Sequence, residues 1–149
     1  MNWQYIAGFF DGEGSIILKN GRSRIAIVQT NKPVLESIKK FTKCGNIFEV
    51  TKRKPHWKDC WVYSISCKKD IYNFLRKITP YLFVKKELAE KGILQLKKEL
   101  IKMEERKKKY IYRKHMAKLL RKKGLSYRAI GKELSMDWGH ARRMILNIK

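Results

Sequence analysis

Apolar and polar positions in the first thirty residues predict one helix followed by two strands. An unbroken apolar stretch at residues 3–11 fits a short, mostly buried helix that stops near two glycines. β-Branched runs at 15–19 and 24–30 flank Asn20-Gly21, which is a strong hairpin signal. The chain therefore opens with a buried helix and an antiparallel strand pair.

The same order of elements repeats downstream. We expect a helix from Asn31, its capping residue, to Phe41, then strands at 47–52 and 60–67, then a helix at 70–79 that ends before Pro80. The order helix, two strands, helix, two strands, helix predicts an α+β fold with an antiparallel sheet.

The C-terminal third has a helical pattern and is rich in Lys and Arg. A long charged helix is expected from residue 85 to about 106, and the stretch 106–121 is dense in basic residues. That stretch fits either a solvated helix face or a bridge that follows DNA phosphates. We expect a domain at 1–105 and a basic helical linker at 106–115.

Residues 116–149 predict a small all-α module of three short helices. Ser126 and Asp137 are good caps for the second and third helices, which a short turn separates. This spacing predicts a helix-turn-helix, which would face Trp138, His140, Arg142 and Arg143 toward the major groove. A helical subdomain that only packs is the alternative.

Net charge narrows the class of partner. The 149 residues include 36 Lys and Arg against 13 Asp and Glu, a formal net charge of +23. Such a charge favours a polyanion, either nucleic acid or an anionic membrane. The aromatic residues lie in the strand-like stretches instead of along one helix face, and no apolar run reaches the ~18 residues that a membrane span needs. Nucleic acid is therefore the expected partner, with no membrane.

Cysteine usage favours a reducing compartment. Cys44, Cys60 and Cys67 are an odd number with no C-x-x-C pair, so a disulfide framework is not expected. They form no zinc-ligand spacing with the three histidines. We expect an intracellular protein, with cytoplasm or organelle left open.

Two acids at the end of the first helix are the main candidates for chemistry. Asp11 and Glu13 face the unfavourable end of the helix dipole and gain most from a bound divalent cation. Ala7, Gly8 and Gly12 are small, so the same helix of a second subunit could approach closely. Paired metal sites at such a twofold axis suit phosphodiester hydrolysis. The alternative is a helix cap with a solvated acid pair.

The string YIAGFFDGEGS resembles the LAGLIDADG motif of homing endonucleases. Residues 61–89, from WVYSIS to PYLFVKKELA, resemble the second block of that family, and the resemblance spans residues 3–101. It implies an αββαββα domain with its sheet in the DNA major groove and its motif helices at the centre of a dimer. One motif in the chain then implies a homodimer on a near-palindromic site. The string GLSYRAIGKELSM resembles the signature of resolvase-like helix-turn-helix domains.

The family resemblance assigns roles to several residues. It implies that Glu13 and the Gly12 carbonyl hold Mg²⁺, or another divalent cation such as Mn²⁺ or Ca²⁺. The dimer-interface residues are expected to be Ala7, Gly8, Asp11 and Gly12. It places Lys85 near the scissile phosphate, with Lys86 as the alternative register, and Asn31, or else Gln29, beside the attacking water. A further arginine of the family falls on apolar Leu35.

Alternation along the strands places Ile16, Leu18, Ile25 and Ile27 inward. The expected DNA contacts are Ser15, Ile17, Lys19, Arg22, Arg24, Ala26, Val28, Arg53, Lys54, Ser64, Tyr127, Arg128, Trp138, His140, Arg142 and Arg143. The resemblance to the LAGLIDADG family implies a homing endonuclease, free-standing or intron-encoded, that makes a metal-dependent double-strand break. A non-catalytic DNA-binding regulator and a maturase of intron RNA are the alternatives.

Overall fold

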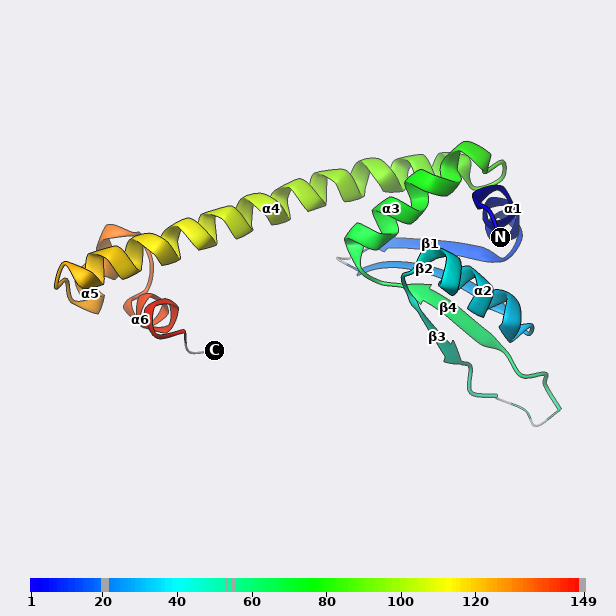
Figure 1. Ribbon diagram of the computed structural model, residues 1–149, viewed down its shortest axis with the longest axis horizontal. Helices are drawn as coiled ribbons and strands as arrows, with labels where there is room; N and C mark the ends of the chain where they lie inside the picture. Colours follow the sequence, from blue (N-terminus) through cyan, green and yellow to red (C-terminus); the bar gives the residue numbers. More distant parts are fainter. Residues whose placement is uncertain (20–21, 53, 55, 148–149) are drawn as a thin grey trace. The chain divides into compact units, whose positions relative to one another are not determined.

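A four-stranded antiparallel sheet forms the centre of the N-terminal part of the computed structural model, which describes residues 1–19, 22–52, 54 and 56–147. The strands are β1 (Gly14–Lys19), β2 (Arg22–Gln29), β3 (Asn46–Glu49) and β4 (Trp61–Ile65), in the spatial order β1-β2-β4-β3 (Figure 1). The predicted antiparallel sheet is confirmed. The turn expected at Asn20-Gly21 lies outside the described residues.

Three helices accompany these strands in the predicted order. They are α1 (Trp3–Glu13), α2 (Lys32–Thr42) and α3 (Lys68–Ile78), and a 3₁₀ turn, η1 (Thr79–Tyr81), contains Pro80. Asn2 caps α1 by accepting a hydrogen bond of 2.8 Å from the backbone N–H of Tyr5. Helix α1 runs two residues further than predicted, because Gly14 is the residue that turns into the extended conformation.

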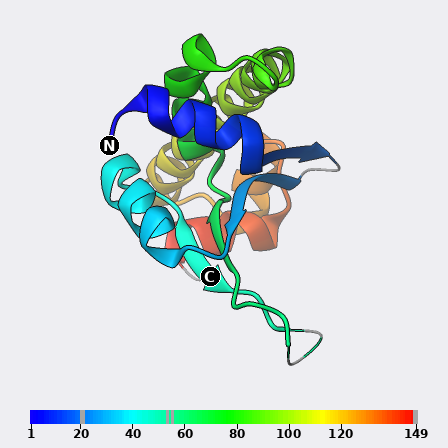
Figure 2. The same cartoon turned by 90° about the vertical axis from the view of Figure 1, so that its right-hand side faces the viewer.

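The core lies on one face of the sheet. Alternation confirms the inward positions of β2, since Ile25 and Ile27 are fully buried, and Ile16 and Leu18 of β1 pack against the same cluster. All three helices contribute to this cluster: their buried members are Ile6, Ala7, Phe10, Leu35, Ile38, Ile71, Phe74, Leu75 and Ile78. Figure 2 shows α1 and α2 from a second direction. In the part of the chain that the structure describes, the helices of this core all lie on that one face of the sheet.

The chain divides into two compact units, Met1–Leu100 and Ile101–Lys149. Helix α4 (Lys86–Lys122) belongs to both, so the basic linker expected at 106–115 is part of a longer helix than predicted. The physical reason is the absence of glycine and proline between residues 93 and 123. The described unit boundary falls five residues before the predicted one.

The second unit contains the end of α4 and two short helices, α5 (Tyr127–Glu133) and α6 (Trp138–Leu146). Their small core is built on Ala117, Ile130 and Ala141. Ser126 and Asp137 cap α5 and α6 through their side chains, as predicted. Gly124 has φ +89° just after α4, a conformation that favours glycine.

Positive charge is spread over both units. Residues 1–100 contain 20 Lys and Arg against 9 Asp and Glu, and residues 101–149 contain 16 against 4, so the net charges are +11 and +12. The smaller unit is therefore the more basic per residue. None of the helices in the described part of the chain is both long and apolar enough to cross a membrane.

Candidate active site and nucleic-acid interface

The Asp11 carboxylate joins the end of α1 to the segment that precedes α4. It accepts backbone hydrogen bonds from Phe83 at 2.6 Å, Val84 at 3.2 Å and Lys85 at 2.9 Å. The Lys85 ammonium in turn donates to the Asp11 carbonyl. Two residues that are 74 positions apart, one assigned to the metal-binding motif and one to the phosphate, thus meet at the C-terminal end of α1.

These contacts shift the acidity of Asp11. Partial burial acts to raise its pKa, but the backbone N–H bonds from Phe83, Lys85 and Val84 and the Lys85 charge lower it more. The net pKa of Asp11 lies below its ordinary value, so the carboxylate stays ionised at neutral pH. The Asp11 carboxylate, with its three N–H donors, connects α1 to the segment before α4. This connection agrees with the structural role expected for Asp11.

Glu13 is the exposed acid of the pair. It is the last residue of α1, and its carboxylate has no recorded hydrogen bond or ion pair with the part of the chain that the structure describes. The last backbone hydrogen bond of α1 is donated by the Gly14 N–H to the Phe10 carbonyl. The Gly12 carbonyl therefore lies past the last hydrogen bond of the helix. A carboxylate and a terminal carbonyl are hard oxygen donors that suit Mg²⁺, which usually also keeps water and substrate phosphate ligands.

The described residues of one chain do not gather a full set of side-chain ligands. Among the described residues, no three His, Cys, Asp or Glu side chains come together to hold a metal ion.

Gly14 is required by the packing of Phe10 at this end of α1. A Cβ added at Gly14 would lie 2.2 Å from Cδ2 of the Phe10 ring, which is fully buried. We expect Gly14→Ala to destabilise the protein by about 1–3 kcal/mol, as overpacked cores do. Urea unfolding checks this, with Ser15→Ala at the adjacent exposed position as the matched control. Equal stability of the two variants would contradict the packing argument.

The exposed side of α1 contains the two glycines of the expected dimer interface. Gly8 and Gly12 have no heavy atom within 4 Å of an added Cβ, and Tyr5 on the same helix is 49% exposed. Ala7, in contrast, is fully buried in the core of its own chain. Its side chain therefore does not lie on the surface that was expected to meet a second subunit.

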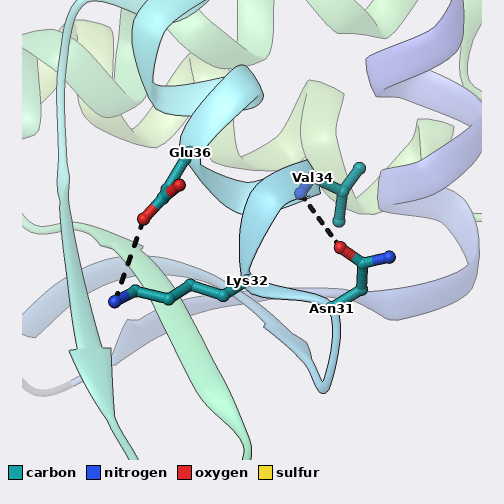
Figure 3. A network of polar contacts seen from close by, with 4 residues as sticks. All are labelled: Asn31, Lys32, Val34 and Glu36. Atoms are coloured by element: carbon teal, nitrogen blue, oxygen red, sulfur yellow. Dashed lines mark hydrogen bonds and ion pairs between the residues drawn. The ribbon is translucent and has the colours of Figure 1, made fainter.

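The two residues considered for water positioning are both held by local hydrogen bonds. Asn31 caps α2, its Oδ1 accepting from the Val34 backbone N–H at 3.3 Å, next to a Lys32–Glu36 ion pair at 3.9 Å (Figure 3). Only the amide NH₂ of Asn31 is left to act as a donor. Gln29 Oε1 accepts from the Thr30 backbone N–H at 2.8 Å. No contact joins either residue to Glu13 or Lys85 among the described residues.

The outer face of the sheet carries half of the residues expected to contact DNA. Exposed members are Ser15, Ile17, Lys19, Arg22, Arg24 and Val28. Arg24 Nε donates to Ser64 Oγ at 2.9 Å, which holds the guanidinium and leaves its two terminal nitrogens as donors. Ser64 is 8% exposed and Ala26 is 6% exposed, so Ala26 presents little surface.

Sequence reasoning missed two apolar residues on this outer face. Phe48 and Val62 are paired in the register of β3 and β4, and Val28 of β2 pairs with Val62 in turn. The alternation of β4, with Tyr63 and Ile65 buried, was the available signal for Val62. Lys54 is exposed in the loop that follows β3, and Arg53 lies outside the described residues.

Helix α6 exposes one polar and aromatic side in the second unit. Trp138, His140, Arg142 and Arg143 are exposed, whereas Ala141 and Met144 are buried. Tyr127 is half-buried, with the Arg121 guanidinium 4.4 Å from its ring centroid, and Arg128 is exposed. Arg121 also donates to the Leu125 carbonyl at 2.9 Å, so this pair holds the connection between α4 and α5.

Gly131 determines how closely α5 approaches the residues that lead into α6. A Cβ there would lie 2.7 Å from the Met136 carbonyl oxygen and 3.2 Å from Trp138 Cα. Because both are backbone atoms, we expect Gly131→Ala to unfold or loosen the second unit at a cost of about 1–3 kcal/mol. Hydrogen exchange of α5 and α6 amides measures the loss, with Lys132→Ala as a control at an exposed position of the same helix. Protection unchanged from wild type in Gly131→Ala would refute this packing.

A family model describing a LAGLIDADG-like domain matches residues 2–79 of the chain. No curated protein matches the chain significantly. The matched residues include α1 with Asp11 and Glu13, the whole sheet, and helices α2 and α3.

Solved structures with a similar fold include homing endonucleases. I-CvuI, in complex with the I-CreI target, shares 23% identity over 64% of this chain and 65% of its own, with a TM-score of 0.52. The archaeal intron-encoded I-Vdi141I, complexed with DNA, shares 21% over 97% of this chain and 94% of its own, with a TM-score of 0.54. I-GzeII, in complex with a DNA target, shares 28% over 66% of this chain and 37% of its own, with a TM-score of 0.51. The aligned region thus spans slightly less than two thirds of I-CvuI. By its matched motif domain and its α+β fold, the chain belongs to the LAGLIDADG-like domain family.

Proposed function

We propose that the protein is a homing endonuclease that makes a double-strand break in a long, near-palindromic DNA site as a homodimer. The observation that carries this proposal is the end of α1, where Glu13 is exposed next to the Asp11–Lys85 contact. Glu13 is the last residue of α1, where the helix dipole disfavours a negative charge, and a bound cation would offset that cost. The DNA-bound relatives support DNA as the substrate.

Two features support the homodimer. The chain contains one acid-pair motif, and its fold matches only 38% of the longer meganuclease I-AabMI, which was solved bound to uncleaved DNA. Two copies of this domain would supply the equivalent of such a chain. The open sides of Gly8 and Gly12 let a second α1 approach closely.

The residues at the end of α1 have distinct roles in the proposed reaction. Glu13 and the Gly12 carbonyl would hold Mg²⁺, or Mn²⁺ or Ca²⁺ in its place. When bound, such a cation supplies Lewis-acid stabilisation of the charge that develops on the phosphodiester. Lys85 would place a positive charge beside the same phosphate. Asn31, whose free NH₂ is a donor, is the candidate for orienting the attacking water.

The sheet and the second unit would bind DNA at different places. Arg22, Arg24 and Lys19 lie on the exposed face of the sheet, on the side opposite the core. We propose that α5 and α6 act as a helix-turn-helix that contacts flanking DNA through the exposed side of α6. Linked modules of this kind lengthen the site and raise affinity without new contacts in either module.

A supercoiled plasmid library with randomised inserts tests the proposal. Purified full-length protein should convert a small set of plasmids to the linear form with Mg²⁺ and none with EDTA. Binding without any cleavage would contradict the endonuclease proposal and favour a regulator. Preferential binding to folded intron RNA over every selected duplex would contradict it as well and favour a maturase.

A further inference from the structure

An apolar row crosses one end of the outer face of the sheet. Val28 of β2, Val62 of β4 and Phe48 of β3 are direct cross-strand neighbours in the antiparallel register. Val28 is 43% exposed and Phe48 is 55% exposed. The row lies on the face opposite the buried residues of the same strands, such as Ile27 and Tyr63, so the monomer does not cover it.

The rest of this face becomes polar and then basic along the strands. The next row contains small residues, with Ala26 paired to Ser64 and Ser64 paired to Asn46. Beyond it lies Arg24, which is held by Ser64 and paired with Ile17, itself 46% exposed. The Lys19–Arg22 pair comes last. The apolar row is therefore one end of a continuous surface whose other end is cationic.

This charge arrangement identifies the occupant of the apolar row. The residues 1–100 that hold the sheet have a net charge of +11, and cations lie on the same face as the row. A polyanion would pair with the cations at the basic end of this face. The apolar row at the other end would then contact an apolar group of the same ligand. In the DNA major groove, the C5-methyl group of thymine is the apolar group on a base edge.

We propose that Val28, Val62 and Phe48 form a thymine-reading row that selects target sites with thymine methyl groups at fixed positions. This inference rests on the proposed binding of DNA by the sheet and specifies which bases the sheet prefers. Arg24 lies toward the basic end of this surface, where its terminal nitrogens suit the O6 and N7 atoms of guanine.

The strand geometry sets the spacing between these two contacts. Val28 and Arg24 are four residues apart on β2, about 14 Å at ~3.4 Å per residue. A strand that follows the groove would cover about four base pairs over this length, since each base pair adds ~3.4 Å. The selected sites should therefore show thymine and guanine preferences about four base pairs apart in each half-site.

Selection from a randomised duplex library, with full-length protein in EDTA, identifies the preferred site. The thymines of that site are then replaced one at a time by deoxyuridine, which removes only the methyl group. We expect one to three replacements per half-site to weaken binding by about fourfold each, from the loss of one buried methyl. A selected pool without thymine enrichment, or equal binding of thymine and deoxyuridine duplexes, would overturn the proposal.

Protein variants assign the effect to this row. Phe48→Ala and Val28→Ala should each abolish the deoxyuridine effect at one position and leave the guanine preference intact. Leu94→Ala, at a 62% exposed position of α4, is the control and should keep the full effect. Persistence of the deoxyuridine effect in both row variants would refute the assignment. Wild-type protein that cleaves DNA but ignores the methyl groups would refute this inference alone, whereas methyl-sensitive binding without cleavage would refute the nuclease proposal alone.

Discussion

Glu13→Gln should lose DNA cleavage by about a thousandfold while retaining its fold and its affinity for the selected duplex. The change removes the carboxylate charge that would hold the cation, and a cation contributes several kcal/mol to the transition state of phosphodiester hydrolysis. Because Glu13 is exposed at the end of α1 and has no recorded contact with the described residues, the substitution leaves the packing of the motif untouched.

Single-turnover cleavage rates with Mg²⁺, together with equilibrium binding in EDTA, measure this effect. Glu90→Gln is the matched control, since Glu90 is an exposed acid on α4 outside the site. It should cleave at the wild-type rate. A Glu13→Gln protein that still cleaves within tenfold of wild type would exclude Glu13 as a metal ligand.

Asp11→Ala should lower the free energy of unfolding by about 2–4 kcal/mol at neutral pH. It leaves the backbone N–H groups of Phe83, Val84 and Lys85 without their shared acceptor, and hydrogen bonds to a charged group are the stronger kind. The Lys85 ammonium would also lose part of the negative potential at the end of α1. Asp11→Asn, which keeps one acceptor oxygen, should fall between the two proteins.

The pH dependence of this loss has a definite sign. Because the pKa of folded Asp11 lies below its ordinary value, the carboxylate stabilises the fold fully above the unfolded pKa of ~3.9. That contribution disappears as pH falls through the lower, folded pKa. Urea unfolding at a series of pH values should show wild type and Asp11→Ala converging under acid conditions. A difference that stays constant down to the acid limit would rule out the carboxylate as the source.

Local patterns located the elements of the first unit, although the strands expected at 47–52 and 60–67 are shorter in the structure, at Asn46–Glu49 and Trp61–Ile65. Alternation of β-branched and polar residues placed Ile25 and Ile27 inward and Arg24 and Val28 outward, and the structure has them so. Capping residues located the starts of helices, as Asn31 does for α2. Such signals act over a few residues, which is why one sequence suffices to find them.

Contacts between distant segments were beyond these patterns. The tie between Asp11 and the segment before α4 depends on how the two meet in the fold. Ala7 was assigned to the dimer interface from its size, but the helical periodicity places its side chain in the buried core. Phe48 and Val62 were missed because a long loop separates β3 from β4. The sequence of such a loop does not fix which residues of the two strands pair.

Sequencing of both DNA strands at the ends of the cleaved product tests the central claim most directly. The account predicts one cut in each strand, a short 3′ overhang, and two half-sites related by a twofold axis at its centre. Ends that are scattered, or a single cut in one strand without a matching cut on the other, would contradict a homodimeric endonuclease built on one LAGLIDADG motif per chain.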